Sequence, residues 1–149
     1  MSERESYDEF IRSTVQEQFR DQIKEQDRDI ILRKVNRSIW VTFQREGIHK
    51  YPDAPEEVSF LRNDHRHIFH FKVQIEVYDN DRDIEFFILK RWLESLYNED
   101  VLQLDYKSCE MMADDLAKKI KDKYLDRWLA IDVSEDNENG CHIEYPKEY

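Results

Sequence analysis

The residues with the clearest chemical potential are the histidines in the segment NDHRHIFHFKVQIEVYD, which spans residues 63–79 and holds three of the chain's five histidines. His65 and His67 are two positions apart at the start of an alternating stretch, so on a strand both imidazoles project to the same side. Such a pair can hold one metal ion when a third ligand comes from elsewhere, and His49, in the loop after the preceding strand, is the obvious candidate. Three neutral imidazoles with an open position form the ligand set of a catalytic zinc site.

A second interpretation places the same histidines at the exposed entrance of a strand. There, the carboxylates of Asp64 or Glu46 would accept hydrogen bonds from the imidazoles, and no metal would be involved. The spacing alone is compatible with both interpretations. His70 has the opposite parity from the pair and is expected to be exposed or at an interface.

Two carboxylates have positions that suggest a ligand. Glu110 lies in the first turn of a predicted helix but off its apolar face, so it either stabilises the helix dipole or points at a ligand or a neighbouring subunit. Glu135 ends a predicted strand on the buried parity, where it either reaches solvent or accepts hydrogen bonds from a bound group. A guanine-like or pterin-like ring offers adjacent N–H and NH₂ donors to such a carboxylate. Cys109 and Cys141 lie on apolar faces and are expected to fill the core.

Alternating and helical patterns predict the elements that position these residues. Phe69, Phe71 and Val73 share one parity of a half-buried strand, and Ser108 is a natural N-cap. In chain order we predict a helix over 5–35, a strand over 38–45, a loop over 46–57, a strand over 65–77, a helix over 84–97, a helix over 108–124, a strand over 127–135, a turn over 136–140 containing Gly140, and a strand over 141–145.

The first predicted helix carries an apolar stripe at every fourth residue: Tyr7, Ile11, Val15, Phe19 and Ile23. The stripe favours packing against its own domain or against a neighbouring subunit over recognition of a foreign partner. We therefore divide the chain into an N-terminal helical extension, residues 1–36, and a folded domain, residues 37–149.

Composition excludes several classes of partner. The net charge is −11 and the acidic residues are spread along most of the chain, which argues against nucleic acid or an anionic membrane as the primary partner. The chain shows no signal-peptide pattern and no apolar run of membrane-spanning length, and its two cysteines form no disulfide framework. We expect a soluble, cytoplasmic protein.

The order of these motifs resembles the tunnelling fold, and more narrowly the family of 6-pyruvoyl-tetrahydropterin synthase and 6-carboxytetrahydropterin synthase. The resemblance covers about residues 38–146. The matching motifs are, in chain order, Phe43 to His49, His65-Arg66-His67 followed by Phe69, Ile84-Glu85-Phe86, Ser108-Cys109-Glu110, and the strand-ending Glu135.

The resemblance implies an α+β fold of order ββααββ: a four-stranded antiparallel sheet with two helices, closed with other copies into a barrel. Family members assemble as trimers, often stacked into hexamers, so a homo-oligomer is expected. It further implies that His49, His65 and His67 hold zinc. Glu135 would bind the donor edge of a pterin, a purine or a nucleotide, and Glu110 with the N-terminal Ser108 of its helix would assist at a subunit interface.

The sequence departs from the family at the catalytic groups. The family carries a catalytic Cys between the first His and the His-x-His pair, but residues 50–64 contain none. Its Asp-His pair is represented here by Asp105-Tyr106, and its Gly between the two ligand histidines by Arg66, a cation that could meet a phosphate. Without thiolate and imidazole, the proton transfers of the family have no evident base.

Several functions therefore remain open. The first is a divergent member that binds a heterocycle without turning it over. The second is an active zinc-dependent lyase of pterin or deazapurine synthesis with Asp105 or Tyr106 as acid or base. The others are a protein that sequesters a nucleotide signal, as in viral anti-defence, and a purely structural oligomer in which the histidines are incidental.

Overall fold

The computed structural model of this chain describes residues 3–33 and 35–147. It divides into two compact units, residues 1–36 and residues 37–149. The elements are, in chain order, α1 (Glu3–Arg33), β1 (Arg37–His49), the 3₁₀ helix η1 (Glu56–Arg62), β2 (His65–Val77), α2 (Phe86–Ser95), β3 (Leu102–Asp105), α3 (Cys109–Lys123), β4 (Leu129–Glu135) and β5 (Asn139–Tyr145). No helix among the described residues is long and apolar enough to cross a membrane.

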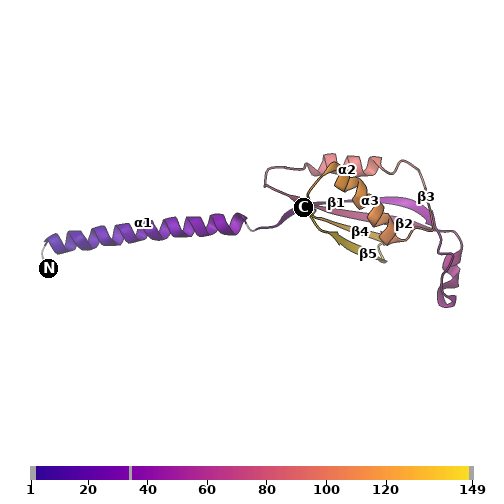
Figure 1. The fold of residues 1–149 in the computed structure, drawn as a ribbon, viewed down its shortest axis with the longest axis horizontal. Helices are drawn as coiled ribbons and strands as arrows, with labels where there is room; N and C mark the ends of the chain where they lie inside the picture. Colours follow the sequence, from indigo (N-terminus) through magenta and orange to yellow (C-terminus); the bar gives the residue numbers. More distant parts are fainter. Residues whose placement is uncertain (1–2, 34, 148–149) are drawn as a thin grey trace. The chain divides into compact units, whose positions relative to one another are not determined.

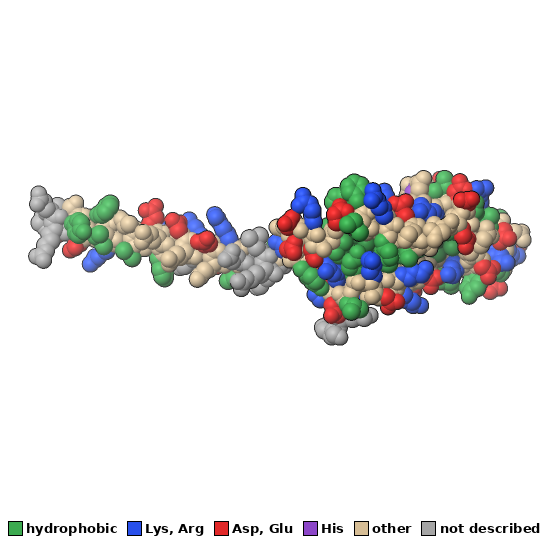
Figure 2. Space-filling model, turned by 90° about the horizontal axis from the view of Figure 1, so that it is seen from above, with side chains coloured by type: hydrophobic (Ala, Val, Ile, Leu, Met, Phe, Trp, Pro, Cys, Tyr) green, Lys and Arg blue, Asp and Glu red, His purple; other side chains and the backbone are tan. Residues whose placement is uncertain are grey.

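Helix α1 exposes the apolar stripe that the sequence predicts. The side chains of Tyr7, Ile11, Val15 and Phe19 are all exposed, and Figure 2 shows apolar side chains standing between charged ones along this helix. The side chain of Ile23, the fifth member of the stripe, lies outside the described part of the structure.

The second unit is built on one mixed sheet with the strand order β3-β1-β2-β4-β5. Strands β1 and β2 pair antiparallel along their full lengths, and β4 and β5 extend the sheet beyond β2. The α+β class is confirmed, but the predicted four-stranded antiparallel sheet is wrong. A fifth strand, β3, pairs in parallel with the end of β1, and with only four residues it is too short to show a clear alternating pattern in the sequence.

Helices α2 and α3 both cover one face of this sheet (Figure 1). The alternating strand residues on that face form the core with Leu89, Leu93 and the apolar side of α3. Ser108 caps α3 as predicted, because its Oγ accepts a hydrogen bond from the backbone N–H of Met111. The strand residues of the opposite parity point to the other face of the sheet and are mostly polar. Acidic and basic side chains are interspersed over the surface of this unit in the view of Figure 2.

The glycines do not mark the turns that the sequence predicts. The loop predicted over 46–57 is wrong at both ends, because β1 continues to His49 and η1 begins at Glu56. Gly47 lies within β1, where a Cβ atom would come within 2.8 Å of Phe69. Gly140 lies within β5 instead of in the turn, and a Cβ atom there would come within 2.2 Å of a backbone oxygen of β4. Close packing therefore requires both glycines.

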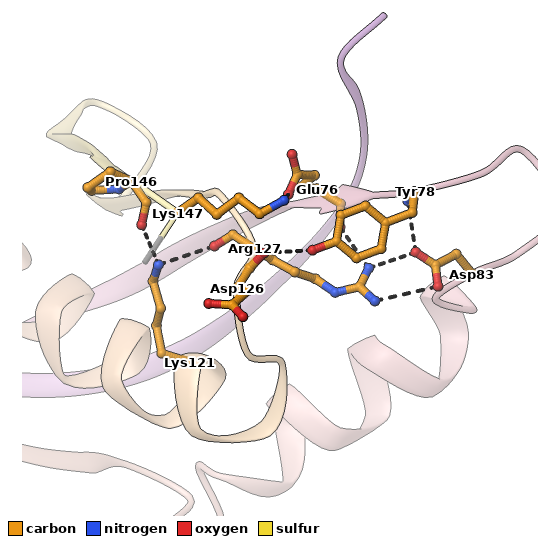
Figure 3. A network of polar contacts seen from close by, with 8 residues as sticks. All are labelled: Glu76, Tyr78, Asp83, Lys121, Asp126, Arg127, Pro146 and Lys147. Atoms are coloured by element: carbon orange, nitrogen blue, oxygen red, sulfur yellow. Dashed lines mark hydrogen bonds and ion pairs between the residues drawn. The ribbon is translucent and has the colours of Figure 1, made fainter. Parts of the chain in front are cut away.

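A polar network ties the start of β4 to the end of β2 (Figure 3). Arg127 donates to the carboxylate of Asp83 at 2.7 Å and to the backbone oxygen of Glu76 at 3.1 Å. The backbone N–H of Tyr78 also donates to Asp83, at 2.8 Å. The hydrogen bonds from Arg127 and from the Tyr78 backbone hold the pKa of Asp83 below its ordinary value. On the other side of this network, Lys121 donates to the backbone oxygen of Arg127.

We expect Asp83→Asn to lower the free energy of unfolding by about 1–2 kcal/mol at neutral pH, because it removes a half-buried charged partner of Arg127. A carboxyl group with a lowered folded-state pKa stabilises the fold above its unfolded pKa, about 3.9, and loses that contribution as the pH falls through the folded-state value. The difference between wild type and variant, measured by urea unfolding, should therefore shrink below about pH 4. Asp81→Asn is the control, since Asp81 and its partner Arg82 are both highly exposed. An effect as large in the control would contradict this explanation.

Candidate metal centre and adjoining cavity

Three histidines meet at one end of the strand pair β1–β2. His49 is the last residue of β1 and lies directly opposite His65, the first residue of β2. His67 follows two positions later and therefore projects from the same face. One ligand nitrogen from each of the three rings lies within 4.8 Å of the other two. The antiparallel register thus brings together the three residues that the sequence singled out.

The Nδ1 atoms of His49 and His65 are both held by backbone carbonyl groups. His49 Nδ1 lies 2.8 Å from the carbonyl oxygen of Lys107, in the segment between β3 and α3. His65 Nδ1 lies 2.9 Å from the carbonyl oxygen of Asn63. A carbonyl oxygen can only accept, so each Nδ1 carries the proton and donates it. The Nε2 of each neutral ring is left with a lone pair.

The Nδ1 atom of His67 is held by a carboxylate. It lies 2.7 Å from Oδ2 of Asp136, whose Oδ1 accepts a hydrogen bond from the backbone N–H of Ile68 at 2.9 Å. The hydrogen bonds from Ile68 and then from His67 hold the pKa of Asp136 below its usual range. Asp136 is therefore an ionised acceptor that fixes the proton of His67 on Nδ1. Hydrogen bonds of this kind orient histidine ligands in metal sites.

The free ring nitrogens have no hydrogen-bond partners where they are buried. This holds for Nε2 of His49 and Nε2 of His67. The nearest carboxylate is that of Glu135, at 3.2 Å and 3.4 Å from these two atoms, but neither contact has the geometry of a hydrogen bond. A buried polar atom without a partner destabilises a fold, and a bound cation would satisfy all of these lone pairs at once.

The residues present fit a zinc ion. Three neutral imidazoles, each with its outer nitrogen held by an oxygen acceptor, are the usual donor set and surroundings of such a site. Tetrahedral ligand atoms around zinc stand about 3.3–3.5 Å apart, so the widest pair of histidine nitrogens would move together on binding. Zinc supplies a Lewis acid and, where a position is open, an activated water.

A cavity of about 880 Å³ adjoins the histidines. Six of the residues predicted for the site line this cavity: His49, His65, Glu135, Tyr106, Ser108 and Glu110. The cavity lies at the N-terminus of α3, where the helix dipole is positive. The structure therefore brings two of the three metal-ligand candidates, His49 and His65, and the predicted ligand-binding carboxylates to one cavity.

Two residues predicted for this site lie away from it. Arg66 has the opposite parity on β2 and pairs with Glu46 on the other face of the sheet. Asp105 is exposed, and its carboxylate lies 3.4 Å from the amino group of Lys50. Neither residue belongs to the lining of the cavity. An alternating strand cannot direct Arg66 toward the same side as its two histidine neighbours.

The cysteines supply no reactive thiolate. Cys109 is buried in the core and lines the cavity, and its burial, followed by the charge of Glu135, raises the pKa of its thiol to about 12. Partial burial also raises the pKa of Cys141. At neutral pH both are protonated, and a protonated thiol is a poor nucleophile. The prediction of core positions is confirmed for Cys109, while Cys141 is half-buried and packs against the core.

The acceptors of the three Nδ1 protons were not predicted from the sequence. Two of them are backbone carbonyl groups, which no residue type reveals. The third, Asp136, had a visible signal, since it directly follows Glu135 in a segment rich in turn residues. Its left-handed backbone, with φ of 54°, turns the chain so that the carboxylate returns to β2.

Asp136→Asn is expected to weaken zinc affinity about 10- to 100-fold, as loss of an outer-shell partner usually does. An amide that turns its NH₂ group toward His67 would make Nδ1 an acceptor and move the ring proton to Nε2. Competition with a chromophoric chelator would measure the change. Asp132→Asn is the matched control, because Asp132 also holds a histidine, His142, but on the other face of the sheet. Equal losses in both variants would contradict a specific role for Asp136.

The sequence matches no protein family model and no curated protein. The case for a function therefore rests on the histidines, the carboxylates and the cavity described above.

Proposed function

We propose that the protein holds a zinc ion on His49, His65 and His67 and binds a flat, nitrogen-rich heterocycle of the pterin or purine class in the adjoining cavity. The observation that carries the proposal is the convergence of three imidazoles, one nitrogen of each within 4.8 Å of the other two, with the Nδ1 atom of every ring held by an oxygen acceptor. Histidines that served only as surface residues would not require an acceptor at the Nδ1 atom of every ring. Three acceptors aimed at three different rings favour a site built for a cation.

The cavity supports a ligand of this class. Its volume, about 880 Å³, is within the range of small-molecule sites, about 300–1,000 Å³. Glu110 and Glu135 both line it and can accept hydrogen bonds from adjacent N–H and NH₂ donors. The resemblance to the pterin synthase family in the sequence points to the same ligand class, since the strand-ending glutamate there meets the ring's donor edge.

Binding without turnover is the form of the proposal that the geometry favours. The cavity offers no thiolate, because the thiol of Cys109 stays protonated. Asp105 lies outside the cavity, which leaves Tyr106 as the remaining candidate of the two predicted acid–base residues. Tyr106 brings a hydroxyl group to the cavity in place of the thiolate and imidazole on which the proton transfers of the resembled family depend.

We further propose that the sheet closes with other copies of the chain into the barrel of a tunnelling fold. Strands β3 and β5 are the two outer strands of the sheet, and the face of the sheet away from the helices is largely polar. Light scattering after gel filtration should give three or six times the chain mass of 18.3 kDa. A monomer at micromolar concentration would contradict this part of the proposal.

Thermal unfolding of the zinc-loaded protein tests ligand binding, with neopterin and guanosine 5′-monophosphate as probes. A probe at 100 times its Kd should add about 2.7 kcal/mol to the apparent stability. Glu110→Gln should reduce the gain, whereas Glu46→Gln, on the other face of the sheet, should leave it unchanged. If neither probe shifts the unfolding of zinc-loaded protein at millimolar concentration, the proposed ligand class is wrong.

A further inference from the structure

The carboxylate of Glu135 stands against two buried histidine nitrogens that have no hydrogen-bond partner. Its Oε1 lies 3.2 Å from Nε2 of His49, and its Oε2 lies 3.4 Å from Nε2 of His67. In the neutral, metal-binding form of each ring the proton is on Nδ1, so a lone pair of nitrogen would face lone pairs of oxygen. Such an arrangement becomes favourable when a cation lies between the two groups.

The two separations fit coordination better than hydrogen bonding. A hydrogen bond from an imidazole N–H to a carboxylate is about 2.7–2.9 Å long, as in the 2.7 Å contact between His67 and Asp136. Neighbouring ligand atoms of a tetrahedral zinc ion lie about 3.3–3.5 Å apart, given Zn–N of about 2.0–2.1 Å and Zn–O of about 2.0–2.2 Å. The separation of 3.4 Å lies in the second range, and the separation of 3.2 Å, which involves the other carboxylate oxygen, lies just below it. We infer that Glu135 is the fourth protein ligand of the metal site.

Little else in the described structure holds this carboxylate in place. Within residues 3–33 and 35–147, the one side chain that donates a hydrogen bond to it is Asn139, and that contact is long, at 3.4 Å. No lysine or arginine of the same residues pairs with it. A carboxylate with 22% of its side chain exposed that is directed at buried lone pairs needs a cation as partner.

This inference rests on the proposed metal site and describes the ligands of the metal before the heterocycle binds. With three histidines and Glu135 as ligands, zinc would have four protein ligands, which is the closed arrangement of a structural site. The same carboxylate is the group proposed to accept the donor edge of the heterocycle. Ligand binding would then withdraw Glu135 from the metal and open a coordination position only when the cavity is occupied. In the absence of the heterocycle, Glu135 would thus keep water and small anions from binding the metal.

Cobalt-substituted protein tests the closure directly, with azide as a small probe for an open coordination position. The wild-type Co²⁺ protein should show an electronic spectrum that azide does not change. Glu135→Ala should open a position, so that azide shifts the visible bands. Asp53→Ala is the matched control, because it removes another carboxylate from the cavity lining and should behave like wild type.

The outcomes separate the two proposals. Loss of cobalt binding in Glu135→Ala but not in Asp53→Ala would also support a ligand role for Glu135. A wild-type spectrum that azide changes as readily as that of Glu135→Ala would overturn the closure while leaving the histidine site intact. A wild-type protein that takes up neither cobalt nor zinc would instead overturn the metal site itself, and the closure with it.

Discussion

Zinc-loaded protein should resist unfolding more than metal-free protein by about 4 kcal/mol when free zinc is 1,000 times its Kd. The gain arises because the unfolded chain does not hold three imidazoles in one place, so the ion binds the folded state selectively. Urea titrations with and without a strong chelator would measure the difference, and metal analysis should find one zinc per chain.

His49→Ala should abolish most of this difference. His49 is the buried member of the triad, and its ring centroid lies 4.6 Å from that of His65 and 5.3 Å from that of His67. The matched control is His70→Ala, which removes a histidine from the same sheet but from the opposite face of β2. The control should keep the full response to zinc. If both variants respond to zinc as wild type does, the convergence of the three rings has no metal-binding role.

Sequence patterns identified the three histidines that the structure brings together, but not the groups that hydrogen-bond to them. Strand parity placed His65 and His67 on one side, and this followed from the alternation of Phe69 and the residues after it. The same parity puts Arg66 on the other side, where the structure finds it, although its charge suggested that it could meet a phosphate. Parity was the more reliable guide because it follows from backbone geometry, whereas the suggested role of Arg66 rested on its charge alone.

The position of His49 was harder to predict, because Gly47 precedes it. A glycine near two prolines favours a loop, yet here it is a strand residue that leaves room for Phe69 and Leu104. That requirement comes from residues distant in the sequence, and β3, which supplies Leu104, was itself too short to recognise. The backbone carbonyl groups that fix the histidine protons depend on the same contacts, so they could not be read from residue types.

Phe69→Ala should lower the free energy of unfolding by about 3–5 kcal/mol and also weaken zinc binding. The side chain is fully buried, and its ring contacts two of the ligand histidines edge-on, at centroid distances of 5.1 Å from His49 and 5.7 Å from His67. A cavity left in its place would remove the packing that holds both imidazoles in position. Urea unfolding of metal-free protein would give the first effect, and chelator competition the second.

Phe71→Ala is the matched control for this prediction. Phe71 is two residues further along β2 on the same buried face, and its ring stacks on Phe43 instead of on a histidine. Its loss should destabilise the fold by a similar amount, about 3–5 kcal/mol, with little effect on zinc affinity. Should either alanine variant fail to fold, the corresponding leucine variants keep most of the side-chain volume and allow the same comparison. Equal losses of zinc affinity at positions 69 and 71 would show that general loosening of the core, and not edge-on support of the imidazoles, governs the metal site.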